Sequence, residues 1–221
     1  MALLKQTATA IYAYFDAVIT ERQARPGDDL ISSFLEAEVD GARLSREDIL
    51  DICFLFLAAG LDTVSASLDC MLLHLALHPG RRHALAADPA LIPNAVEELL
   101  RWESPVMMVA RFATQDTEIA GCLVRKGQVV TALLGAANTD AEAVADPEAV
   151  RFDREVNRQI AFGRGIHRCL GSHLARLELR IALQEWHARI PDYRVTPGFQ
   201  PVFTTSIRSL TALPLLLGPS A

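Results

Sequence analysis

The sequence predicts a mainly α-helical protein with small antiparallel β-sheets, an α+β fold. Apolar residues recur at helical spacing over long stretches, most clearly between residues 45 and 78. Short apolar runs between residues 106 and 133 are separated by turn residues such as Lys126-Gly127, a pattern typical of short strands. Of the 221 residues, 51% are apolar, so enough apolar surface is available for a sizeable core.

Composition excludes several classes of protein. The net charge of −6 disfavours a nucleic-acid partner. The N-terminus has no charged segment followed by an apolar one, so we expect no signal peptide. The longest apolar run, residues 53–61, is bracketed by Asp51 and Asp62 and is too short to span a bilayer, so we expect no membrane segment. A cytoplasmic, reducing location without disulfides is indicated by four cysteines that lack regular spacing: Cys53, Cys70, Cys122 and Cys169.

The N-terminal part is predicted to hold two helices. Apolar side chains recur at helical spacing over residues 3–25, and Pro26-Gly27 ends that helix. Asp28-Asp29 can cap a second helix from Leu30 to Ala37, and Asp40-Gly41 is a predicted turn.

A long helix is predicted from about Ser45 to His78, on the order of 50 Å at 1.5 Å per residue. Ser45 and Asp48 resemble a capping box at its start. Small residues dominate one face, which implies close approach by a flat group or another backbone. This face carries Phe56, Ala59, Gly60, Thr63 and Ser67. Gly60 weakens the helix by about 1 kcal/mol relative to Ala, so a compensating role is expected.

Prolines divide the following segment. Pro79 and Pro93 frame a short helix, and a second helix is expected over Asn94–Trp102. Glu98 and Arg101 lie three residues apart on its face, where an ordinary surface pair would also suit them. Residues 135–161 lack periodicity and are predicted to be irregular. Strands are expected at 106–112, 118–120, 128–133, 193–195, 201–203 and 207–217.

Residues 162–171, Phe-Gly-Arg-Gly-Ile-His-Arg-Cys-Leu-Gly, form the most distinctive stretch. Its glycines allow tight turns and close approach to a bulky group. A helix is expected to follow and to end near Ile190-Pro191, which places Cys169 at its N-terminus, where free N–H groups favour a thiolate. The expected apolar face carries Leu174, Leu177 and Ile181, and the expected outward face carries Arg176, Glu178 and Arg180.

Cys169 admits other interpretations. A lone cysteine is more often a small buried apolar residue than a ligand. His167 and Cys169 could also form part of a zinc site or a Cys–His nucleophile. No second ligand pair at zinc-like spacing exists in the sequence.

The stretch resembles the haem-binding loop of the cytochromes P-450, F-x-x-G-x-[HR]-x-C-x-G, and matches it at every fixed position. The resemblance implies a haem b cofactor (iron protoporphyrin IX) with the Cys169 thiolate as the iron ligand. It also implies cofactor contacts from Phe162, Gly165, His167 and Gly171, with His167 holding a propionate.

Ala59-Gly60-Leu61-Asp62-Thr63 resembles the oxygen-binding groove of the same family, [AG]-G-x-[DE]-T. The resemblance implies that Ala59 and Gly60 line the haem and that Thr63 and Asp62 deliver protons to dioxygen. Adjacent helical residues point about 100° apart, so Thr63 should face the haem and Asp62 should point aside. The hydroxyl of Thr63 could instead, or in addition, bond to the carbonyl of Ala59 or Gly60.

Three further features extend the resemblance. Glu98-x-x-Arg101 resembles the family's E-x-x-R motif, which implies a network with Arg154. Arg111 stands where the family places an arginine on a haem propionate. The implied substrate cavity is lined by Phe56, Val106, Met107 and Met108, and by Thr204 and Thr205 of the turn at residues 203–206.

The resemblance covers residues 1–221 but corresponds only to about the C-terminal half of the family fold. It implies a haem-thiolate monooxygenase that inserts one oxygen atom of O2 into an apolar small molecule, with electrons from a ferredoxin or flavodoxin. The alternative is a truncated, non-catalytic haem- or partner-binding fragment. The sequence departs from the family pattern at four positions: Thr139, Val144, Val150 and Gln159.

Overall fold

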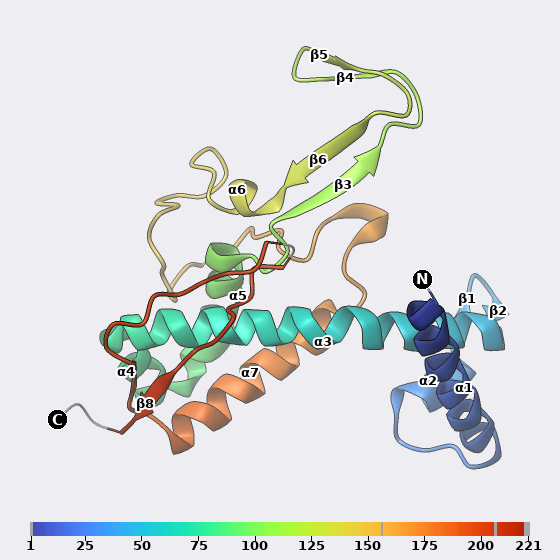
Figure 1. The fold of residues 1–221 in the computed structure, drawn as a ribbon, viewed down its shortest axis with the longest axis horizontal. Helices are drawn as coiled ribbons and strands as arrows, with labels where there is room; N and C mark the ends of the chain where they lie inside the picture. The colour runs from blue at the N-terminus through green and yellow to red at the C-terminus, as the bar shows by residue number, and fades with distance from the viewer. Residues whose placement is uncertain (1, 156, 206, 219–221) are drawn as a thin grey trace. The chain divides into compact units, whose positions relative to one another are not determined.

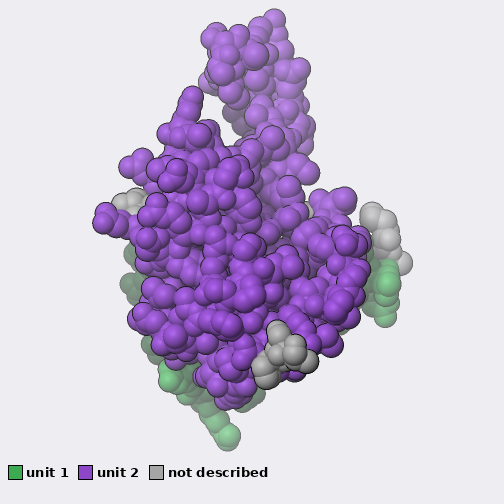
Figure 2. Space-filling model, turned by 90° about the vertical axis from the view of Figure 1, so that its left-hand side faces the viewer, with its two compact units in different colours: residues 1–61 green, residues 62–221 purple. Residues whose placement is uncertain are grey.

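The structure is a computed structural model that describes residues 2–155, 157–205 and 207–218. The chain divides into two compact units, residues 1–61 and 62–221, which Figure 2 distinguishes by colour. In the described part, helices predominate and the strands form four two-stranded antiparallel sheets (Figure 1), so the predicted fold class is confirmed.

The first unit begins with helices α1, Ala2–Ala24, and α2, Leu30–Glu36, close to their predicted ranges. The Oδ1 atom of Asp29 accepts a hydrogen bond from the N–H of Ser32 at 2.8 Å and so caps α2. Strands β1, Glu38–Val39, and β2, Ala42–Arg43, pair around the predicted turn, where Asp40 and Gly41 have positive φ angles of 53° and 80°.

Helix α3 covers Arg46–Leu77, as the apolar periodicity predicts. The predicted capping box is present: the N–H of Ser45 donates to Asp48 Oδ2 at 2.9 Å, and the N–H of Asp48 donates to Ser45 Oγ at 3.1 Å. The whole helix is long and apolar enough to cross a membrane by length and composition, with a mean hydropathy of 1.8 over 18 residues. The core helix of a soluble protein passes the same test.

The core of the second unit lies among the C-terminal part of α3 and three further helices. These are α4, Pro79–Ala87, α5, Ile92–Glu103, and α7, Ser172–Arg189, with a 3-10 turn, η1, at Pro89–Leu91. Each buries an apolar face in one cluster, whose members include Met71, Leu75, Leu85, Val96, Leu99, Leu179 and Leu183.

One expectation about α7 is wrong. Leu174, Leu177 and Ile181 are 37%, 53% and 50% exposed, whereas the buried face carries Leu179 and Leu183. The predicted outward residues Arg176 and Arg180 are partly buried, and only Glu178 is exposed. Both faces of the helix are apolar at helical spacing, and packing against α4 and α5 selects the Leu179 face.

The strands of the second unit form three ribbons. Strand β3, Met108–Phe112, pairs with β6, Val129–Leu133, and this ribbon leads to the β4–β5 hairpin, Thr117–Ile119 and Cys122–Val124 (Figure 1). Strand β7, Tyr193–Val195, pairs with β8, Leu215–Leu217. Gly127 has a φ of +86°, as its predicted turn requires.

Two stretches differ from the predicted elements. The strand expected at residues 201–203 is reduced to one bridge between Phe203 and Leu210, and the last strand is shorter than expected. A short helix, α6, Leu134–Asn138, begins the segment predicted to be irregular. Both differences concern short segments, where local sequence preference is weak and tertiary contacts decide.

His74 is buried next to Arg81 and His78. Arg81 donates to His74 Nε2 at 3.0 Å, and the ring of His78 stacks on that of His74 with centroids 4.2 Å apart. Burial lowers the pKa of His74 to about 4, and the charges of His78 and Arg81 lower it further. An arginine only donates hydrogen bonds, so Nε2 of His74 must be unprotonated for this contact to exist.

The stability of the second unit is therefore expected to fall at mildly acidic pH. A histidine pKa below its unfolded value of about 6.5 contributes stability above pH 6.5, which is lost as pH falls toward 4. Between pH 7 and pH 5 we expect the free energy of unfolding to drop by about 1–2 kcal/mol, after allowing for partial solvent screening. Denaturant titration followed by tryptophan fluorescence measures this, because Trp102 and Trp186 both lie in this unit.

His74→Gln is the matched variant for this measurement. Glutamine keeps a hydrogen-bond acceptor for Arg81 but does not titrate. We expect it to reduce the pH dependence; an equal dependence in both proteins would contradict the assignment to His74.

Candidate functional site

The loop at residues 162–171 turns tightly before α7. Gly163 and Gly165 have positive φ angles of 69° and 73°, a region that favours glycine, and a short 3-10 turn, η2, covers Gly165–His167. The N–H of Cys169 donates to the carbonyl of Phe162 at 2.9 Å. Helix α7 starts at Ser172 with Gly171 as its N-cap. Cys169 therefore precedes the helix instead of lying in its first turn, and its own N–H is not free.

The surroundings of Cys169 fit an iron-bound apolar ring. Its side chain is exposed, and the exposed apolar side chains of Ile166 (97%) and Leu170 (58%) lie on either side of it in the sequence. A Cβ added to Gly165 or Gly171 would meet no atom within 4 Å, so open space adjoins the loop. A thiolate is a soft ligand that suits haem iron, and exposed apolar groups suit a porphyrin face.

A hollow of about 320 Å3 borders the same loop. Its lining includes the loop backbone and three arginines, one of which comes from α7. The lining residues are Gln159, Phe162, Gly163, Arg164, Gly165, Arg168 and Arg176. The exposed Arg164 and Arg168 thus place positive charge beside the Cys169 loop.

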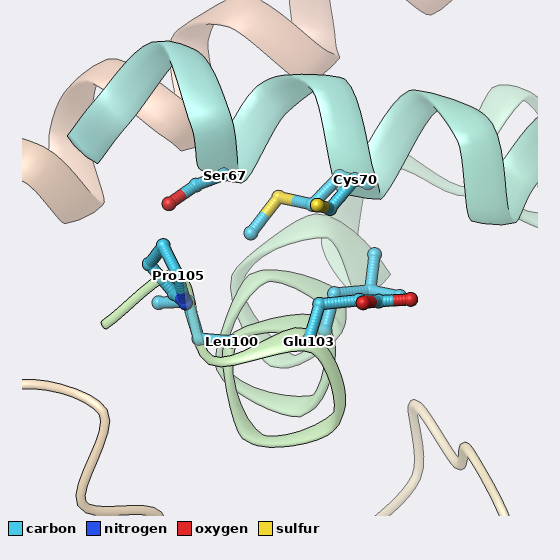
Figure 3. Close-up of a pocket in the computed structure, with 7 residues that line it drawn as sticks. Ser67, Cys70, Leu100, Glu103 and Pro105 are labelled. Carbon is cyan, nitrogen blue, oxygen red and sulfur yellow. The ribbon is translucent and has the colours of Figure 1, made fainter. Parts of the chain in front are cut away.

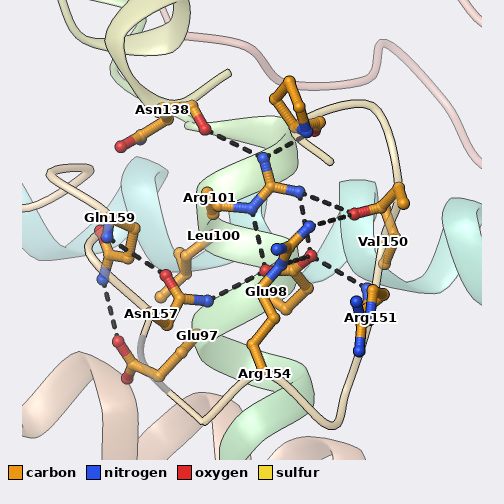
Figure 4. Close-up of polar contacts among 12 residues, drawn as sticks. Glu97, Glu98, Leu100, Arg101, Asn138, Val150, Arg151, Arg154, Asn157 and Gln159 are labelled. Carbon is orange, nitrogen blue, oxygen red and sulfur yellow. Dashed lines mark hydrogen bonds and ion pairs between the residues drawn. The ribbon is translucent and has the colours of Figure 1, made fainter. Parts of the chain in front are cut away.

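Glu98, Arg101 and Arg154 form the ion-pair network that the sequence predicts (Figure 4). Arg101 donates from two nitrogens to the two carboxylate oxygens of Glu98, each at 2.9 Å. Arg154 Nε donates to Glu98 Oε1 at 2.8 Å. The side chains of Glu98 and Arg101 are 0% exposed, so this is not the surface pair that the sequence also allowed.

The same network orders the irregular segment at residues 135–161. The Glu98 carboxylate also accepts hydrogen bonds from the N–H of Arg151 at 2.9 Å and from Asn157 Nδ2 at 3.0 Å. The remaining arginine donors reach carbonyl oxygens of the segment, those of Asn138, Ala145, Asp146, Pro147 and Ala149. Every one of these contacts joins residues of the second unit, so the segment folds around one buried carboxylate.

Burial alone would raise the pKa of Glu98, because a carboxylate is costly in a dry interior. Hydrogen bonds from Arg101 and Arg154 outweigh that effect and hold the pKa below its usual range. Glu98 is therefore ionised near neutral pH, as its partners require.

The predicted groove residues lie on α3. Asp62 is exposed and Thr63 is partly buried, in agreement with their different directions on the helix. Ser67 is buried and its Oγ donates to the carbonyl of Thr63 at 2.7 Å. In the first unit, Ala59 and Gly60 are exposed, Phe56 is half-buried, and a Cβ added to Gly60 would meet no atom within 4 Å.

Side chains of α3 and α5 lie along a narrow seam (Figure 3). It leaves about 0 Å3 that a water molecule could occupy. Ser67 and Cys70 face Leu100, Glu103 and Pro105 across it. Burial raises the pKa of Cys70 to about 12, so this cysteine is a protonated core residue.

The predicted substrate-cavity residues of the second unit are largely exposed. Met107 and Met108 are 47% and 52% exposed, and Val106 is half-buried. Thr204 and Thr205 are exposed, with the hydroxyl of Thr204 donating to the carbonyl of Ile207. The final residue of that predicted turn, Ser206, lies outside the described residues.

Arg111 lies on β3 opposite Val130 and is exposed. Its Nη1 donates to the carbonyl of Ala110 at 2.8 Å. Among the described residues, no hydrogen bond or ion pair joins Arg111 or the cavity residues to the Cys169 loop, so their roles stay predictions.

Sequence comparison decides the family. The sequence model of the family "Cytochrome P450" matches residues 2–88 and 87–186, well over half of the chain. The chain belongs to the cytochrome P450 family. The identification agrees with the resemblance of the Cys169 loop and with the buried Glu98–Arg101 pair.

Curated P450 relatives are bacterial. Steroid C26-monooxygenase of Mycolicibacterium smegmatis is 40% identical over 192 residues, which are 87% of this chain and 48% of the relative. Vitamin D(3) 25-hydroxylase of Pseudonocardia autotrophica is 36% identical over 214 residues, 95% of this chain and 53% of the relative. The chain therefore spans about half the length of the curated P450 relatives it matches.

Solved P450 structures share the fold. CYP109E1 of Bacillus megaterium, in complex with testosterone, superposes with a TM-score of 0.88 at 35% identity and covers 96% of this chain and 59% of its own. PksS of Bacillus subtilis gives a TM-score of 0.87 at 36% identity, with coverages of 96% and 55%. The crystal structure of CYP109E1 therefore matches almost the whole length of this chain.

Proposed function

We propose that this chain provides the iron-ligating and proton-delivering part of a haem-thiolate monooxygenase acting on an apolar small molecule. The observation that carries the proposal is the Cys169 loop. It presents an exposed thiol between exposed apolar side chains, next to open space and a glycine-turned backbone. The relatives named above as a steroid monooxygenase and a vitamin D(3) hydroxylase favour an apolar substrate for this chain as well.

Haem b, when bound, supplies the iron at which O2 is activated with two electrons. In this proposal Cys169 is the iron ligand. Its backbone is tied to Phe162, so the loop presents the sulfur in one orientation. His167 and Arg111 would hold the two propionates as hydrogen-bond donors, while the loop backbone at Phe162, Gly165 and Gly171 would keep side-chain bulk away from the ring.

On α3, Thr63 and Asp62 serve proton delivery. The exposed Asp62 exchanges protons with solvent, and the Thr63 hydroxyl passes them toward dioxygen. Ala59 and Gly60 leave room on that face for a flat group. Phe56, Val106, Met107, Met108, Thr204 and Thr205 line the substrate cavity in this proposal.

The electron donor that we propose is an acidic ferredoxin or flavodoxin. Arg158, Arg164 and Arg168 are all exposed close to the Cys169 loop in sequence. Positive charge there would steer a negatively charged partner and raise its association rate. A cytoplasmic location suits such a donor and belongs to the same proposal.

A second candidate is a non-catalytic haem- or partner-binding fragment. Two observations favour this candidate: the match to about half of the relatives' length, and an exposed apolar stripe beside α7. Leu174, Leu177 and Ile181 share one face of the helix, Leu170 precedes it, and all four side chains are exposed. In a working enzyme, an exposed apolar stripe of this kind has to be covered by another part of the protein. In a haem site open to water, the thiolate loses the dry surroundings that tune it.

Haem titration of the purified chain tests the main proposal. We expect haem to bind and, after reduction and addition of carbon monoxide, to show the thiolate-type absorption band. The absence of that band would overturn the proposal. The loaded chain is then supplied with a ferredoxin system. We expect no sustained product from these 221 residues alone, and coupled hydroxylation would rule out the fragment reading.

A further inference from the structure

A second polar network adjoins the Glu98 network and reaches the Cys169 loop. It begins at Asn157, which donates to Glu98 Oε2 at 3.0 Å and accepts from the N–H of Gln159 at 3.1 Å. The Gln159 side chain then acts in both directions. Its Nε2 donates to Glu97 Oε2 at 2.9 Å (Figure 4), and its Oε1 accepts from the N–H of Ala161 at 2.6 Å.

Glu97 connects the network to α7. Arg176 donates to its two carboxylate oxygens from Nε at 2.5 Å and from Nη2 at 3.0 Å, a bidentate pair. The two side chains are only 19% and 21% exposed. Burial raises the pKa of Glu97, but hydrogen bonds from Arg176 and Gln159 outweigh burial and hold it below its usual range. The pair is therefore charged near neutral pH.

The guanidinium of Arg176 also covers the ring of Phe162. Its central carbon lies 4.3 Å from the ring centroid, within the range of a cation–π contact. Phe162 is the residue whose carbonyl accepts the N–H of Cys169 at 2.9 Å. Holding the Phe162 side chain thus also holds the backbone to which Cys169 is tied.

We propose that Gln159, Glu97 and Arg176 form a bridge that positions Phe162 and, through it, Cys169. Gln159 fixes the backbone entering the loop, Glu97 fixes Arg176, and Arg176 fixes the ring of Phe162. These are positioning residues, because they reach Cys169 only through Phe162. The geometry stands on its own, while its importance for iron ligation rests on the proposed function.

The sequence pointed to this bridge only weakly. Gln159 is one of the positions at which the chain departs from the family pattern, and Arg176 was expected to face outward. A glutamine suits the bridge because one amide group both donates and accepts.

The test compares amide hydrogen exchange in the full chain carrying Arg176→Gln, Arg176→Lys or Gln159→Leu. Arg164→Gln is the control, since it removes an exposed positive charge from the same loop. The two regions compared are the loop amides of Gly163 and Cys169 and the α7 amides around Leu179 and Leu183. We expect about tenfold faster exchange of the loop amides in Arg176→Gln and Gln159→Leu, with α7 unchanged.

Arg176→Lys should give an intermediate rate, because lysine keeps the charge but loses the bidentate pair and the planar stacking on Phe162. Unchanged loop exchange in Arg176→Gln and Gln159→Leu, or equal acceleration in α7, would overturn the bridge. The same variants loaded with haem should show a smaller share of the thiolate-type band than Arg164→Gln. If neither the variants nor the unaltered chain binds haem, the proposed function fails. The exchange rates of the loop amides still decide whether the bridge positions Phe162 and Cys169.

Discussion

Replacing Cys169 with Ser is expected to abolish the thiolate-type absorption band of the reduced, carbon monoxide-treated, haem-loaded chain. A serine hydroxyl stays protonated near neutral pH and cannot provide the electron-rich sulfur that this band reports. The substitution exchanges one sulfur for an oxygen on an exposed side chain, so the folded state should be kept. Difference absorption spectra at equal haem loading measure the effect.

Cys122→Ser is the matched control for Cys169→Ser. Cys122 is also a free, exposed cysteine, but it lies on β5, outside the loop at residues 162–171. We expect its variant to keep the full band. Retention of the band in Cys169→Ser would show that another residue ligates the iron, and loss of the band in both variants would point to general damage to the protein.

Glu98→Ala is expected to lower the free energy of unfolding by about 3–5 kcal/mol, because it strands buried arginine charge. Arg101 is 0% exposed and would lose both bonds to the carboxylate, while Arg154 would lose one. The N–H of Arg151 and the amide of Asn157 would also lose their acceptor. Denaturant titration and the yield of folded protein measure the loss, which should exceed any loss of ligand affinity.

Glu148→Ala provides the control for this measurement, since Glu148 is an exposed carboxylate of the same irregular segment. We expect a change within about 0.5 kcal/mol, as for most surface substitutions. Glu98→Gln separates charge from hydrogen bonding, because glutamine keeps one acceptor oxygen but no charge. A Glu98→Ala variant as stable as Glu148→Ala would mean that the network contributes nothing to the fold.

Local patterns were enough to predict most of the helices. The capping box at Ser45, the cap at Asp29 and the turn at Asp40-Gly41 each depend on residues within a few positions of one another. The partners of Glu98 in the sequence motif were also predicted correctly, although burial of the pair was left open. The short helix α6 and the β4–β5 pairing were not predicted, since segments of three to five residues carry too little periodicity.

The sequence by itself determined the fold class, the family and the residue that we propose as the iron ligand, because a ten-residue motif at fixed spacing can be recognised without coordinates. Only the tertiary structure decided which face of α7 is buried. It also decided that Arg176 lies against Phe162 and Glu97. The first result depends on the packing of α7 against α4 and α5. The second depends on contacts of Arg176 with the loop residue Phe162 and with Glu97 of α5, which lies about eighty residues away in the chain. Two apolar faces on one helix look alike in sequence. The face that packs into the core decides which neighbours a charged side chain such as that of Arg176 meets.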